Sequence, residues 1–229
     1  IASVVMKPGL MGAGGMKVTS MSFYKSVREL TKQYGVHLIS DEVATGFGRS
    51  GELFVSKKAS VSPDFMCLSK GLTNGQLPLA VTLTTNEIYN TFYGDFNEGK
   101  TFYHGHTFTA NPLGCAVGLA AIDLLETLPW KKNVALIESQ LKNGVVSLVD
   151  TFSFVNNPRV FGSVAAVDVS ASRDDLFLLS QQGFKLNLCI RPLGNTIYLY
   201  LPIMISTDDV TIILNQMNSL FDWLEIHIG

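Results

Sequence analysis

The sequence predicts an α/β protein with a mostly parallel sheet, followed by a smaller α+β domain. In the first part of the chain, short apolar runs alternate with segments of helical periodicity, the pattern of βαβ units. After about Leu128 this alternation ends. We therefore expect two domains, residues 1–128 and 129–229, and 229 residues that are 47% hydrophobic suffice to build cores for both.

The first domain is expected to open with a buried strand over residues 1–6. Apolar side chains at helical spacing predict a helix over residues 22–34, which Gly35 ends. Several short apolar runs predict further strands. A short helix is expected from about Asn86. Asn111 and Pro112 are typical of an N-cap and a first helical position, so another helix is expected there. The further strands are expected at residues 36–41, 65–69 and 79–85.

In the second domain we expect a long helix over residues 131–149 and a strand over residues 160–169. A helix is expected over residues 175–182. The last helix is expected from about Asp208, with Ser206 or Thr207 as its cap. Two runs that flank a turn suggest a pair of strands, at residues 185–191 and 196–201.

Composition and charge argue against several classes of protein. The formal net charge is −2, so no basic excess indicates a nucleic acid or an anionic membrane as partner. The longest apolar stretch, residues 197–205, is too short to span a bilayer. The three cysteines lie far apart and no targeting segment is visible, which favours reduced thiols in a cytoplasmic protein.

Two ionisable side chains, Asp41 and Lys70, end apolar strands. The carboxyl ends of parallel strands line the ligand crevice of such a sheet. A lysine amine together with an acid that holds a protonated ring nitrogen is what pyridoxal phosphate chemistry requires. On position alone, however, most charges at strand ends are simply solvated, and that alternative stays open.

Other motifs are weaker evidence for a functional site. Gly46–Gly51 matches G-x-G-x-x-G, but it does not directly follow a strand and no convincing helix follows it, so a tight loop is favoured over a dinucleotide site. Gly12–Gly15 could bind an anion through its amides, although a flexible loop between strand and helix is the commoner explanation. His104 and His106 lack a third ligand, so no metal site is expected. Arg191 leaves an apolar run and could be ion-paired or face a ligand carboxylate.

Four blocks of the sequence together carry a family resemblance. They are DEVATGFGRSGELF (41–54), PDFMCLSKGLTNGQLPLAVTLTT (63–85), HGHTFTANPLGCA (104–116) and IRPLGNTIYLYLP (190–202). In this order they resemble the class III aminotransferases, which are fold-type I pyridoxal phosphate enzymes. Ala44 and the GAGGM run at residues 12–16 are most similar to the branch that converts 7-keto-8-aminopelargonate to 7,8-diaminopelargonate in biotin biosynthesis, with S-adenosylmethionine as amino donor. The likeness covers only the C-terminal half of the family.

The resemblance implies small-molecule substrates, pyridoxal phosphate as cofactor, and a homodimer with shared active sites. It assigns a role to seven residues. Lys70 matches the lysine that binds the cofactor covalently, and Asp41 matches the carboxylate that contacts the cofactor's ring nitrogen. His106 and Thr107 match the pair that reaches the cofactor phosphate of the neighbouring subunit. Gly105 matches a glycine that contacts the substrate, Arg191 matches the arginine that binds the carboxylate of the keto substrate, and Tyr198 lies where a tyrosine lines the pocket for that substrate.

The chain also departs from the family. Lys7 and Met11 stand where the family usually has glutamate and glutamine. Two alternatives therefore remain. One is another class III enzyme that acts on an ω-amino acid such as ornithine or 4-aminobutyrate, and the other is an inactive truncated fragment.

Overall fold

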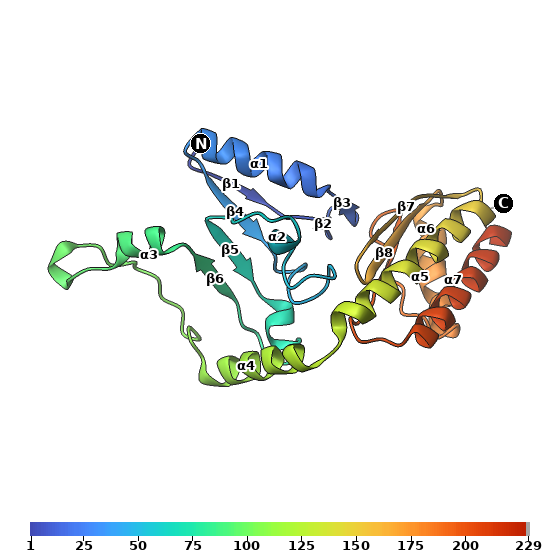
Figure 1. Ribbon diagram of the computed structural model, residues 1–229. Helices are drawn as coiled ribbons and strands as arrows, with labels where there is room; N and C mark the ends of the chain where they lie inside the picture. The colour runs from blue at the N-terminus through green and yellow to red at the C-terminus, as the bar shows by residue number, and fades with distance from the viewer. Residues whose placement is uncertain (228–229) are drawn as a thin grey trace. The chain divides into compact units, whose positions relative to one another are not determined.

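The computed structural model describes residues 1–227, which divide into two compact units (Figure 1). Unit 1 comprises residues 1–8, 20–47 and 52–128. Unit 2 comprises residues 9–19, residues 48–51 and the chain from residue 129 onward. The main change from one unit to the other therefore falls between Leu128 and Pro129, and two short segments join unit 2 from within the first half of the sequence.

Unit 1 contains a four-stranded sheet in the order β1-β4-β5-β6 (Figure 1). Its strands are β1 (Ser3–Met6), β4 (His37–Asp41), β5 (Phe65–Leu68) and β6 (Val81–Thr84). The first three are parallel and β6 is antiparallel to β5, so the predicted α/β class with a mostly parallel sheet is confirmed. The expectation that residues 1–6 form a buried strand is wrong in part, because β1 lies at the sheet edge and Val5 is 67% exposed.

Side-chain caps begin several helices of unit 1, and the cap at Asn111 is the one that the sequence predicts. The Ser20 hydroxyl accepts a hydrogen bond from the Phe23 amide at 3.1 Å, and the Asn111 side chain accepts one from the Leu113 amide at 3.1 Å. These bonds satisfy amides that the first helical turn leaves unpaired. The helices are α1 (Met21–Gln33), α2 (Val55–Lys58), α3 (Asn86–Phe92) and α4 (Pro112–Thr127), with 3-10 turns η1 (Lys70–Thr73) and η2 (Phe96–Glu98).

A small buried core holds α1 on the sheet of unit 1. Tyr24 of α1 is fully buried and packs with Leu38 of β4, Ala59 and Val61. Its hydroxyl donates a hydrogen bond to Ser40 Oγ at 2.9 Å. Because Tyr24 finds a partner for its polar atom, the ring can be buried at little cost, and β4 is fixed directly before its last residue.

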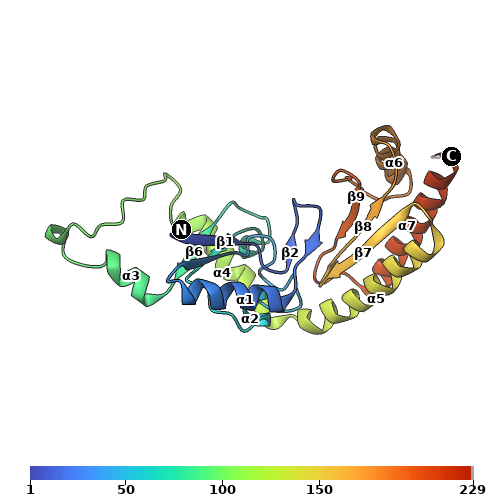
Figure 2. The ribbon, with the colours of Figure 1, turned by 90° about the horizontal axis from the view of Figure 1, so that it is seen from above.

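Unit 2 combines an antiparallel sheet, in the order β7-β8-β9, with three helices. In Figures 1 and 2, α5 and α7 lie side by side along this sheet, and they supply much of its core. A separate two-stranded hairpin also belongs to this unit. The elements are the hairpin strands β2 (Leu10–Met11) and β3 (Lys17–Val18), then α5 (Trp130–Thr151), β7 (Val155–Phe161), β8 (Val164–Val169), α6 (Arg173–Lys185), β9 (Thr196–Tyr200) and α7 (Thr207–His227).

Two expectations for unit 2 differ from the structure. The strand predicted over residues 160–169 is confirmed for residues 164–169, which form β8, but Gly162 has a φ of +58° and reverses the chain, so residues 160 and 161 belong to β7 instead. Residues 185–191 do not form a strand, because the amides of Leu186 and Leu188 bond back to carbonyls of the last turn of α6. Consequently β9 pairs with β8 instead.

The glycine-rich segments have structural partners. Residues 12–15 join β2 to β3, rather than a strand to a helix as expected. The amides of Gly14, Gly15 and Met16 already donate to carbonyls of this turn and are not available to an anion. Arg49, inside the Gly46–Gly51 loop, donates to Ser163 Oγ at 2.8 Å. Within residues 1–227, no single helix is long and apolar enough to cross a membrane, although α4 and α5 pass that test as a bent pair.

Candidate active site

Asp41 is the last residue of β4, a strand flanked on both sides by parallel neighbours. Its register partner on β5 is Cys67, and its own side chain is 23% exposed. Oδ1 accepts a hydrogen bond from the Val43 amide at 3.1 Å, and Oδ2 lies 3.1 Å from Lys7 Nζ. The carboxylate is therefore held at the carboxyl edge of the sheet with one face still accessible.

Lys70 follows β5 at the same edge of the sheet and begins the η1 turn. Its φ is +46°, a conformation that costs a residue with a side chain about 1–3 kcal/mol and that tends to occur at functional sites. Gly71 comes next, and a Cβ on it would lie 2.9 Å from Phe47 Cβ. The backbone that carries Lys70 is therefore tightly constrained.

Of the two lysines at this edge, Lys70 is the candidate nucleophile. Lys7 Nζ is already engaged in an ion pair with the Asp41 carboxylate. The Lys70 side chain is exposed and, among residues 1–227, forms no hydrogen bond or ion pair. The structure thus brings one carboxylate and one unpaired amine to neighbouring strand ends.

Glu42 supports this edge from inside the protein. It is fully buried directly after Asp41, and its Oε2 accepts a hydrogen bond from the Val55 amide at 2.6 Å. Its Oε1 accepts from the amide and the hydroxyl of Ser56 at 2.8 and 2.5 Å. Glu42 therefore caps the single turn of α2 and ties it to the end of β4.

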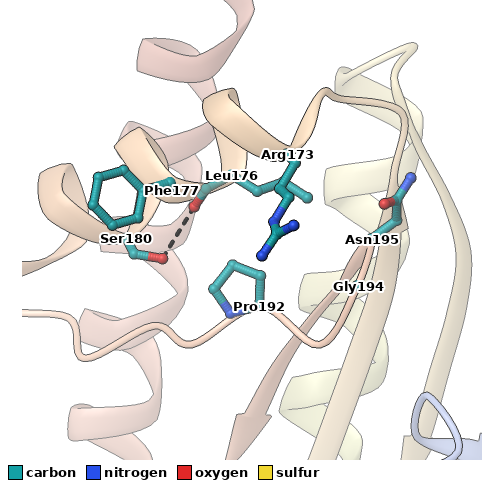
Figure 3. A pocket seen from close by; sticks show the side chains of 7 residues that line it. All are labelled: Arg173, Leu176, Phe177, Ser180, Pro192, Gly194 and Asn195. Carbon is teal, nitrogen blue, oxygen red and sulfur yellow. Dashed lines mark hydrogen bonds between the residues drawn. The ribbon is translucent and has the colours of Figure 1, made fainter.

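Two surface hollows differ in their relation to these residues. An open depression of about 370 Å³ is lined by Lys70 together with Thr73, Leu77 and other residues of the loop before β6. A second hollow of about 460 Å³ lies between α6 and the 192–195 turn of unit 2 (Figure 3). None of the seven predicted site residues lines this second hollow, whereas Lys70 lines the first.

Three of the other predicted residues lie on an exposed segment of unit 1. Gly105, His106 and Thr107 belong to a segment, residues 89–110, that is exposed along its whole length, and Figure 1 shows α3 and the chain after it leaving the sheet as an arm. His106 Nδ1 accepts a hydrogen bond from the Phe108 amide at 3.2 Å. Within the described residues, no side-chain hydrogen bond or ion pair joins these three residues to Asp41 or Lys70.

Arg191 and Tyr198 belong to unit 2. Arg191 is exposed and forms no ion pair with any described residue, which leaves its guanidinium free for a ligand. Tyr198 is half-buried on β9. Among residues 1–227, no group of three or more histidine, cysteine, aspartate or glutamate side chains could hold a metal ion.

Two contacts at this edge go beyond what the sequence predicts. They are the ion pair of Lys7 with Asp41 and the buried hydrogen bonds of Glu42. The position of Lys7, directly after the first apolar run, is the same signal that identified Asp41 and Lys70, and it could have identified Lys7 as well. The buried position of Glu42 has no comparable signal, because its hydrogen-bond donors come from a distant turn.

The family model described as "Aminotransferase class-III" matches residues 1–221. A curated relative from Geobacter sulfurreducens, named adenosylmethionine-8-amino-7-oxononanoate aminotransferase, is 39% identical over 95% of this chain and 50% of its own length. A relative of the same name from Aquifex aeolicus is 38% identical over 95% of this chain and 50% of its own length. The chain therefore spans about half the length of the curated relatives it matches.

Solved structures agree with this likeness. An adenosylmethionine-8-amino-7-oxononanoate aminotransferase from Methanocaldococcus jannaschii superimposes with a TM-score of 0.86 and 31% identity, over 96% of this chain and 53% of the other. An amine transaminase from an uncultivated Pseudomonas species, in its PLP-bound form, superimposes with a TM-score of 0.90 and 29% identity, over 100% of this chain and 53% of the other.

Proposed function

The chain belongs to the class-III aminotransferase family, and on that premise we propose that the whole protein is a pyridoxal-phosphate-dependent aminotransferase. The observation that carries this proposal is the pair of strand ends at which Asp41 and Lys70 stand. An acid and an unpaired amine on neighbouring parallel strands are the two groups that this cofactor needs from a protein.

The residues present fit the cofactor. The Asp41 carboxylate has lone pairs left to accept a ring N–H, since the Val43 amide and Lys7 use only part of its capacity. Lys70 offers an amine that is exposed and unpaired among the described residues. When bound, pyridoxal phosphate supplies an electron sink for the carbon that carries the substrate's amino group.

Each side chain then has a task that its surroundings support. Lys70 would hold the cofactor through its amine and would move a proton at the reacting carbon, and such positioned acid–base catalysis is worth about 10²–10⁴-fold in rate. Asp41 keeps the ring nitrogen protonated through a charge-assisted hydrogen bond. Arg191, exposed and without an ionic partner among the described residues, receives the far carboxylate of the keto substrate, and Tyr198 lines that pocket.

We further propose that the acceptor is 8-amino-7-oxononanoate, which is 7-keto-8-aminopelargonate, that the donor is S-adenosylmethionine, and that the reaction belongs to biotin biosynthesis. The names of the Geobacter and Aquifex relatives support these substrates. Three free cysteines support a reducing compartment such as the cytoplasm. A donor screen separates this assignment from an ω-amino acid transaminase, because 4-aminobutyrate or ornithine would then replace S-adenosylmethionine.

The decisive experiment replaces Lys70 in the full-length protein. Lys70→Ala should abolish transamination and should prevent the covalent attachment of pyridoxal phosphate that borohydride reduction produces in wild-type protein. The matched control is Lys25→Ala, an exposed lysine on α1, which should keep both. Retained transamination by the Lys70 variant would remove the proposal, and a wild-type protein that binds no cofactor would favour an inactive fragment.

Arg191 tests the substrate site. Arg191→Ala should raise KM for the keto acid, since loss of an arginine–carboxylate pair that the bound substrate desolvates costs about 2–5 kcal/mol in binding. The KM for the amino donor should change little. Equal losses for both substrates would indicate a structural arginine instead.

We also propose a homodimer in which Gly105 contacts substrate and the exposed His106 and Thr107 serve the partner's cofactor phosphate. Exposed aromatic side chains on the same arm, such as Phe96 and Tyr103, support an interface there. Co-expression of Lys70→Ala and Thr107→Ala chains should then restore one intact site per mixed dimer, or about a quarter of wild-type activity overall. No recovery in a verified mixed dimer would contradict shared sites.

A further inference from the structure

The ion pair between Lys7 and Asp41 lies where the proposed function needs a free carboxylate. Lys7 follows β1, and the register pairs Met6 with Ser40, so the next residues of the two strands are neighbours at the carboxyl edge. Lys7 Nζ lies 3.1 Å from Asp41 Oδ2. The Lys7 side chain is 51% exposed, so it can leave this contact without disturbing the core.

An ammonium at this distance changes what Asp41 presents to a ligand. The carboxylate oxygens still have lone pairs for another donor. However, the ion pair as a whole carries no net charge, and a second cation is attracted to it less strongly than to an isolated carboxylate. A protonated ring nitrogen is such a second cation.

We propose that Lys7 is a positioning residue that competes with the cofactor's ring nitrogen for Asp41 and thereby weakens cofactor binding. This inference rests on the proposed function and concerns the affinity of that same site. Lys7 needs no contact with substrate or reacting atoms, because it acts only through the carboxylate it pairs with.

The expected change in the dissociation constant of the cofactor follows from how exposed the Lys7–Asp41 ion pair is. Ion pairs at exposed positions contribute about 0.2–1 kcal/mol, which corresponds to about 1.4- to 5-fold in a dissociation constant. Because Asp41 is only 23% exposed, we expect the upper part of that range. The effect should shrink with salt, since the screening length falls from about 10 Å at 0.1 M to about 3 Å at 1 M.

The test measures the dissociation constant of pyridoxal phosphate for the full-length apo-protein by absorbance titration. Lys7→Met should bind the cofactor about two- to fivefold more tightly than wild type at low salt and about equally at 1 M salt. Lys7→Arg, which keeps the charge, should match wild type. The control Lys25→Met removes an exposed lysine from α1 and should also match wild type.

Two further measurements make the result specific. In an Asp41→Asn background, Lys7→Met should have no effect on affinity, because the competition needs the carboxylate. The ¹⁵N chemical shift of ring-labelled pyridoxal phosphate should indicate a larger protonated fraction in Lys7→Met than in wild type. Equal or weaker cofactor binding by Lys7→Met would overturn the role of Lys7.

Failure of this inference is distinguishable from failure of the proposed function. If Asp41→Asn and Lys70→Ala both bind pyridoxal phosphate as wild type does, the proposed function itself fails. If those variants lose affinity while Lys7→Met is unchanged, only the competition by Lys7 is refuted.

Discussion

Replacing Glu42 by glutamine should destabilise unit 1 by about 2–4 kcal/mol and weaken the site beside it. The Glu42 carboxylate is fully buried and accepts hydrogen bonds on both oxygens, from the Val55 amide and from the amide and hydroxyl of Ser56. A glutamine amide can replace only one of these two acceptors. Whichever way it turns, its NH₂ group must face a backbone N–H.

The magnitude follows from the bonds that are lost. A hydrogen bond to a charged group contributes about 1.5–3 kcal/mol, and a buried amide left without an acceptor costs about 1–3 kcal/mol more. Removing a buried charge offsets part of this cost. Because Glu42 directly follows Asp41, loosening its attachment to α2 should also displace the Asp41 carboxylate and lower cofactor affinity in the full-length protein.

Hydrogen exchange and denaturant unfolding together test this reasoning. The amides of Val55 and Ser56 should lose protection in Glu42→Gln, since their acceptor is the altered group. The control Glu29→Gln changes an exposed glutamate on α1 and should stay within about 0.5 kcal/mol of wild type. Wild-type protection of both amides in Glu42→Gln would refute the capping role.

Three other outcomes are expected. Gly71→Ala should unfold at lower temperature than wild type, because its Cβ would lie 2.9 Å from Phe47 Cβ. The control Gly12→Ala also lies at a glycine without positive φ, and its Cβ would meet only Met16 Sδ at 4.0 Å, so it should melt close to wild type. Burial raises the pKa of Asp64, but hydrogen bonds led by Arg28 outweigh this and hold the pKa below its ordinary value. The carboxylate therefore stabilises the fold above about pH 4, and thermal melts of wild type and Asp64→Asn should converge as pH falls further. Asn111→Ala should cost about 0.5–2 kcal/mol in denaturant unfolding by removing the cap of α4, and an unchanged midpoint would contradict that cap.

Much of the fold could be predicted because its signals are local. The cap at Asn111 and the apolar periodicity of α1 act within a few residues, so they can be read without knowing what packs nearby. Residues 185–191 show the opposite case. Their apolar content matches a strand, but the amides of Leu186 and Leu188 found acceptors in the preceding helix, which no periodicity reports.

The sequence by itself determined which residues end the strands, and hence that Asp41 and Lys70 are candidates for one site. Only the tertiary structure decided which strands are neighbours, that Lys7 takes part in that edge, and that Glu42 is buried beneath it. The physical reason is that parallel strands are joined by crossovers, so adjacent strand ends lie far apart along the chain. The pairing of strands then depends on packing between segments that are distant in sequence, and local sequence patterns do not predict that packing.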